Sequence, residues 1–152
     1  MCVTELRASL KQLVLFGAIA SAAAIVGGCA TLGFGASSPG SGLRCVDDSP
    51  TCVTARRRAL LTLRRDSSRA WVRQSPDART YAAGVRLFAF RLEKDKLNCD
   101  ELTRGVQEAD GAPRILKSAD AKSLTPAQIS RGMMLSAEIG RELANERRRR
   151  CR

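Results

Sequence analysis

From residue 50 onward, apolar residues recur every three or four positions, which is the period of an amphipathic α-helix. This pattern predicts four helices, over about 50–73, 76–95, 99–110 and 126–149. Tyr81, Val85, Phe88 and Leu92 have the spacing that places them on one face of the second helix. Residues 85–92 also alternate imperfectly between apolar and polar positions, so a β-strand is the alternative there. The pattern as a whole predicts an all-α domain, a small up-down four-helix bundle.

Helix-start signals recur at the boundaries of these segments. Three hydroxyl residues precede a proline, in Ser49-Pro50, Ser75-Pro76 and Thr125-Pro126, and this pair is typical of a helix N-terminus. Asn98 with Glu101, and Thr125 with Gln128, have the spacing of a capping box. Gly111 and Pro113 are expected to end the third helix. In the fourth helix, small residues recur every fourth position and predict close helix packing: Gly132, Ser136, Gly140 and Ala144.

The N-terminal segment has a different pattern. Residues 13–28 carry no charge, follow Arg7 and Lys11, and lead into Val26-Gly27-Gly28-Cys29. A basic start, an apolar core and small residues are typical of a secretory signal. The ending resembles the lipobox of bacterial lipoproteins. The alternatives are an uncleaved membrane anchor, a signal cut within residues 20–22, and a buried core helix.

The resemblance implies that residues 1–28 are a cleaved signal peptide and that Cys29 carries the lipid. Residues 29–43 would then be the lipidated cysteine and a flexible tether rich in Gly and Ser, and residues 44–152 the helical domain. Lipoproteins retained in the inner membrane often have Asp after the lipidated cysteine, but Ala30 stands here. The expected location is the periplasmic face of the outer membrane, with the inner membrane as the alternative.

The chain is strongly basic, with a net charge of +11. Loss of residues 1–28 removes two basic residues and one acidic residue and leaves +10. An exported protein does not normally meet nucleic acid, so the expected partners are anionic envelope components or acidic proteins. The predicted anion-binding residues are Arg147, Arg148, Arg149 and Arg150, with Arg58, Arg65 and Arg69 second. Alternatively, the arginines are solvated surface and the last four neutralise a helix end, with Glu146 pairing with Arg150.

Four cysteines follow Cys29, and an even number in an oxidising compartment predicts two disulfides. They are Cys45, Cys52, Cys99 and Cys151. An up-down order brings all four to one pole of the bundle, which leaves three pairings open; we favour Cys45–Cys52 with Cys99–Cys151. Because the chain has no histidine and no Cys-x-x-Cys spacing, we expect no metal site and no cofactor.

The missing histidine also excludes the commonest general base and the Ser-His and Cys-His pairs of hydrolases. Asp47-Asp48 and Asp100-Glu101 are interpreted as helix-start residues rather than catalytic carboxylates. The predicted function is a non-catalytic envelope lipoprotein that acts as a structural or interaction module. The alternative is a binder or inhibitor of an envelope enzyme through the Arg-rich surface, and a hydrolase is a more distant alternative.

Overall fold

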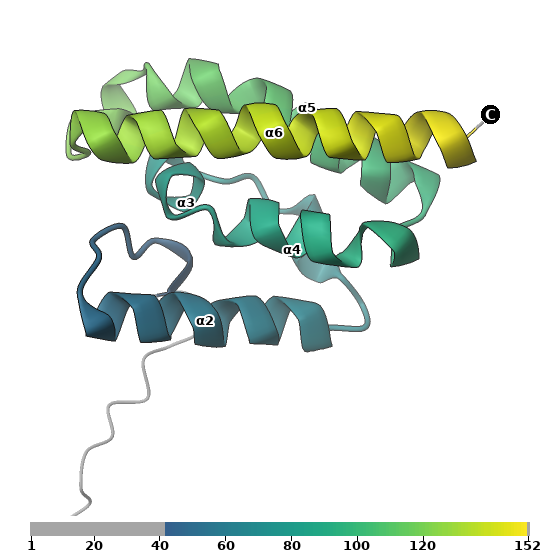
Figure 1. The fold of residues 1–152 in the computed structure, drawn as a ribbon, viewed down its shortest axis with the longest axis horizontal. Coiled ribbons are helices and arrows are strands. Elements are labelled where there is room, and N and C mark those ends of the chain that lie inside the picture. Colours follow the sequence, from purple (N-terminus) through teal and green to yellow (C-terminus); the bar gives the residue numbers. More distant parts are fainter. Residues whose placement is uncertain (1–41, 152) are drawn as a thin grey trace, which may run out of the picture. The chain divides into compact units, whose positions relative to one another are not determined.

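The computed structural model describes residues 42–151, and every regular element in this range is helical (Figure 1). The α-helices lying wholly within it are α2 (Pro50–Arg65), α3 (Ala78–Ala83), α4 (Val85–Glu93), α5 (Cys99–Leu116) and α6 (Pro126–Arg150). Short 3₁₀ helices occur at η1 (Ala70–Arg73), η2 (Lys94–Lys96) and η3 (Ala119–Ala121). The all-α prediction is therefore confirmed, and the strand alternative for residues 85–92 is wrong. None of these described helices is both long and apolar enough to span a membrane.

The predicted signal peptide, Cys29 and most of the predicted tether lie outside the described residues. Two residues of the predicted tether, Gly42 and Leu43, lie within the described range. Gly42 and Leu43 are helical, and Gly42 is buried against Ala55 and Ala59 of α2. The folded domain therefore includes residue 42.

Side-chain caps begin the helices largely as predicted. The Ser49 hydroxyl accepts the N–H of Cys52 at the start of α2, and complete capping boxes begin α5 at Asn98 and α6 at Thr125. The exception is the second predicted helix. It begins after Asp77, whose carboxylate accepts the Thr80 N–H, and not at Pro76.

The first two predicted helices are too long. The α2 helix ends at Arg65 because the Asp66 carboxylate accepts the N–H groups of Ser68 and Ala70 and turns the chain. The segment predicted as one helix over 76–95 is divided at Gly84, whose φ of +74° is left-handed backbone that glycine adopts without strain. Gly84 ends α3 and begins α4, which changes the direction of the chain.

The third predicted helix is too short. Rather than stopping at residue 110, α5 continues through Gly111 and Pro113 to Leu116. Ala109, Ala112 and Leu116 are buried along this last part. Packing of these side chains against the rest of the domain therefore outweighs the local helix-breaking signal.

The four longer helices α2, α4, α5 and α6 form a bundle with α4 between α2 and α6 (Figure 1). The up-down order holds for α4, α5 and α6 but not for α2. Arg64, near the end of α2, pairs with Glu93 at the end of α4, with 2.7 Å between Nε and Oε1. The α2 and α4 helices therefore run in the same direction, because the chain returns through residues 66–77 before α4 begins.

The disulfides are Cys45–Cys52 and Cys99–Cys151, with Cα–Cα distances of 5.6 and 5.7 Å. The favoured pairing is confirmed. Their expected position at one pole is wrong. Next to Cys45, the Val46 carbonyl accepts from Gln128 near the start of α6, while Cys151 caps the end of the same helix, about 35 Å further along. The parallel course of α2 and α4 separates the two bridges.

The small residues of α6 allow two other helices, α3 and α5, to pack closely against it, as the spacing predicted. A Cβ on Gly132 would lie 3.2 Å from the Tyr81 carbonyl oxygen and 3.3 Å from the Ala82 Cα. A Cβ on Gly140 would lie 3.0 Å from the Ala109 Cβ. Gly132 therefore sets the distance between α6 and α3, and Gly140 that between α6 and α5.

We predict that Gly132→Ala destabilises the domain, because the backbone of α3 would have to move. Overpacking of this kind costs about 1–3 kcal/mol, more than the gain of about 1 kcal/mol from replacing a helical glycine. The matched control is Gly111→Ala in α5, where an added Cβ meets only the Tyr81 hydroxyl at 3.7 Å. Urea unfolding should show a lower free energy of unfolding for Gly132→Ala than for the wild type, and no decrease for Gly111→Ala. Equal stability of both variants would contradict the close approach.

Candidate functional site

The predicted C-terminal arginine cluster is divided between structural and free side chains. Arg149 forms an ion pair with Glu146, and the Arg149 hydrogen bond lowers the pKa of that carboxyl. Arg150 also pairs with Glu146, at 3.7 Å, as the sequence suggested. Its guanidinium donates further to the carbonyl oxygens of Lys94, Asp95 and Leu97, at 3.0–3.1 Å. Arg150 therefore ties the end of α6 to the turn that follows α4.

The other two arginines of the cluster make weaker attachments. Arg148 donates to the Asn145 side chain, and Arg147 is half-buried without an ion pair in the described range. Two of the four predicted arginines, Arg147 and Arg148, are thus without an acidic partner in the described range. Because the other two are already paired, the four side chains are less able to bind an anion together.

Helix α2 carries two of the other three predicted anion-binding residues, Arg58 and Arg65, and contains five arginines and no acidic residue. Two of the five have acidic partners: Arg56 pairs with Asp48 at 3.2 Å, and Arg64 pairs with Glu93. Arg57, Arg58 and Arg65 are exposed and make no ion pair with residues 42–151. Arg69 lies beyond the end of α2 and pairs with Glu101 at 2.9 Å.

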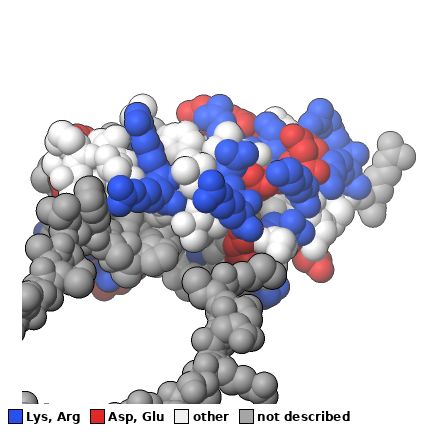
Figure 2. Space-filling view, turned by 90° about the horizontal axis from the view of Figure 1, so that it is seen from below, with Lys and Arg blue, Asp and Glu red and all other residues white. Residues whose placement is uncertain are grey.

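The exposed side of α2 carries a stripe in which two arginines alternate with a threonine and a leucine. Thr54, Arg58, Leu61 and Arg65 follow one another at helical spacing, and the Leu61 side chain is 46% exposed. Because α2 packs chiefly on α4, this stripe has no helix over it within the described residues. Figure 2, seen from the α2 side, shows Lys and Arg side chains outnumbering Asp and Glu on this face. We call Arg58, Leu61 and Arg65 the outer face of α2.

A groove runs along one flank of the same helix. It has a volume of about 270 Å³ and lies where α2 meets α4, the end of α3 and α6. Its apolar lining is Val53, Leu60, Ala83, Val85, Phe88 and Leu135, and its basic lining is Arg56, Arg57 and Arg131. An apolar floor with a few polar groups is typical of a binding site.

Two of the three groove arginines are held by the chain itself. Arg131 donates to Asp48 at 2.9 Å and to the carbonyl oxygens of Val46 and Ala82. Hydrogen bonds from Arg56 and from Arg131 lower the pKa of the Asp48 carboxyl. Arg57 makes no ion pair with residues 42–151. The groove therefore has two positioned cations and one that is available to an anionic ligand.

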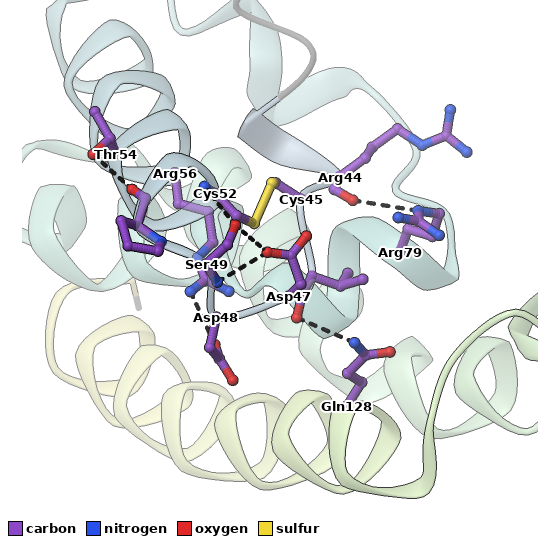
Figure 3. The surroundings of a disulfide bond; sticks show 12 residues. Arg44, Cys45, Asp47, Asp48, Ser49, Cys52, Thr54, Arg56, Arg79 and Gln128 are labelled. Atoms are coloured by element: carbon purple, nitrogen blue, oxygen red, sulfur yellow. Dashed lines mark hydrogen bonds and ion pairs between the residues drawn. A yellow bond between two sulfur atoms is a disulfide. The ribbon is translucent and has the colours of Figure 1, made fainter.

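The loop closed by Cys45–Cys52 positions Asp48 beside Arg56, one of the groove arginines (Figure 3). Within it, Asp47 accepts the Ser49 N–H at 2.9 Å, and its carboxylate lies near the two cysteine sulfurs. Because those sulfurs are bonded to each other, this group of three is a structural loop rather than a set of metal ligands. Asp47 supports the helix start as predicted, whereas Asp48 is an ion-pair partner.

One buried ion pair was not anticipated from the sequence. Arg86 of α4 is only 3% exposed and pairs with Glu108 of α5, with Nε 3.0 Å from Oε1. Arg86 also donates to the Trp71 and Gln74 carbonyls at 2.6 and 2.8 Å. Burial raises the pKa of Glu108, and Arg86 opposes that rise. The signal in the sequence was an arginine within the apolar run 85–90. Its bonds are all internal, so its role is structural.

Comparison of the chain with models of protein families, with curated proteins and with solved structures finds no match.

We predict that Arg150→Gln lowers stability while Arg148→Gln does not. Arg150 makes three charged hydrogen bonds to carbonyls at a partly exposed position, and their loss should cost about 1–2 kcal/mol. Arg148→Gln is the matched control, because Arg148 lies in the same last turn of α6 and its substitution removes the same charge. Urea unfolding midpoints provide the measurement. If both variants behave alike, Arg150 has no anchoring role and the cluster is only surface charge.

Proposed function

We propose that this protein is a non-catalytic envelope lipoprotein. The lipid on Cys29 holds the chain at the periplasmic face of the outer membrane, or of the inner membrane as the alternative. The helical domain serves as an interaction module. The lipobox-like sequence supports the anchor, and two disulfides suit an oxidising compartment.

The groove beside α2 is the observation that carries the binding role. Among the described residues, its lining combines apolar side chains with guanidinium groups and contains no carboxylate, thiol or hydroxyl. Such a surface offers contact area and positive charge but no group that could attack a substrate or transfer a proton near neutral pH. Binding is therefore the activity that its chemistry supports.

A second, narrower function follows from the charge of the same groove. We propose that its occupant is an acidic amphipathic helix of an envelope protein, which agrees with a binder or inhibitor of an envelope enzyme. Apolar side chains of such a helix would contact Leu60, Phe88 and Leu135, and a carboxylate would pair with Arg57. Arg57 suits this role because its planar guanidinium binds a carboxylate through two hydrogen bonds.

The anchor is tested by labelling cells with radioactive palmitate. The wild-type chain should incorporate the label, and Cys29→Ser should not, because the thiol that would carry the diacylglycerol is gone. Cys2→Ser is the control and should label normally, since Cys2 lies within the signal segment. Continued labelling of the Cys29→Ser chain would contradict the proposal that Cys29 carries the lipid.

The groove is tested by filling it. Val53→Phe places a larger side chain into the lining, whereas Leu61→Phe adds the same ring to the exposed side of the same helix. A photo-crosslinking residue at Leu60 should capture a defined envelope protein. The affinity of that purified protein should fall about tenfold or more with Val53→Phe or Arg57→Gln and remain unchanged with Leu61→Phe. Equal affinity for all variants would show that the partner does not bind in the groove.

A further inference from the structure

We propose that the outer face of α2 docks on the anionic headgroups of the bilayer to which the chain is anchored. This inference rests on the proposed lipid anchor and adds an orientation: α2 lies against the membrane and α5 faces away from it. The occupant of this face is a lipid surface, whereas the groove on the flank of α2 remains open to a protein.

The charge of α2 is the first argument. Arg58 and Arg65 are exposed cations without an ion pair in the described range, and α2 contains no acidic residue. The acidic residues Asp48 and Asp66 stand near its two ends, and both are engaged. Asp48 pairs with Arg56 and Arg131, and Asp66 accepts backbone N–H groups. A basic residue near an anionic leaflet contributes about fivefold to partitioning.

Leu61 is the second argument. It lies between Arg58 and Arg65 on the same stripe and is one of the few large apolar side chains exposed in residues 42–151. A helix with cations around an exposed leucine has the composition of an interfacial membrane helix. The leucine can enter the headgroup region while the neighbouring guanidinium groups contact phosphates.

The place where the chain enters the domain is the third argument. Gly42 is buried against Ala55 and Ala59, so the backbone joins the domain at α2 itself. Twelve residues, 30–41, separate Gly42 from Cys29. Even fully extended, this segment spans no more than about 45 Å. An anchored chain therefore keeps α2 within reach of the bilayer at a high effective concentration, so weak contacts suffice for docking.

The test uses the chain from residue 29 onward with Cys29→Ser, so that no acyl group contributes to binding. Its partitioning is measured on phosphatidylcholine vesicles with and without phosphatidylglycerol, at low and at physiological salt. We expect binding only to the anionic vesicles and a steep decline with salt, because exposed charges act within about 8 Å at 0.15 M. The double variant Arg58→Gln, Arg65→Gln should bind about 25-fold more weakly.

The matched control removes the same charge from α5. Arg104→Gln with Arg114→Gln replaces two exposed arginines that make no ion pair in the described range. This variant should bind nearly as the wild type does. Equal weakening by both double variants would show that only net charge matters and would overturn docking through α2.

A second readout reports contact directly. Leu61→Trp should give a blue-shifted fluorescence on anionic vesicles, and Trp71 adds only a constant background because it is buried. An unshifted spectrum on vesicles that bind the protein would overturn the orientation. The two proposals fail separately, since palmitate labelling tests the anchor and vesicle binding of the acyl-free chain tests the face of α2.

Discussion

The buried ion pair between Arg86 and Glu108 is the interaction on which the arrangement of this domain depends. Arg86 joins α4 to α5 through Glu108 and also holds the carbonyls of Trp71 and Gln74. It therefore positions the return segment between α2 and α3, which contains η1, as well as the packing of α4 on α5. Separating the two charges would leave one of them buried and unpaired, which costs several kcal/mol. Arrangements in which α2 folds back directly on its neighbour are disfavoured for this reason.

The position of α2 follows from that return segment. Because the chain travels back through residues 66–77, α2 runs parallel to α4 and packs chiefly against it. One flank of α2 then lines the groove with Phe88 and Leu135, and the opposite flank receives Gly42. The remaining side stays exposed with its arginines. The two proposed binding surfaces are thus consequences of one helix placed at the edge of the bundle.

Arginine serves four different purposes in this chain, and its abundance alone does not distinguish them. Arg86 is a buried structural cation, Arg150 holds carbonyls at the end of a helix, and Arg64 forms a partly exposed ion pair. Arg58 has no acidic partner among residues 42–151. The predicted anion-binding set contained members of the second, third and fourth kinds, because a sequence displays charge but not the groups that surround it.

The sequence by itself determined the features that depend on neighbours a few positions away. Ser49, Asn98 and Thr125 cap helices because each reaches a backbone N–H three residues on, and apolar spacing indicated an all-helical domain. Tertiary structure alone decided the course of α5 through Pro113, the direction of α2 and the separation of the disulfides. It also formed the groove, whose lining comes from residues 53 to 135. These features depend on contacts between distant segments, whose energies outweigh local preferences and leave no periodic signal in the chain.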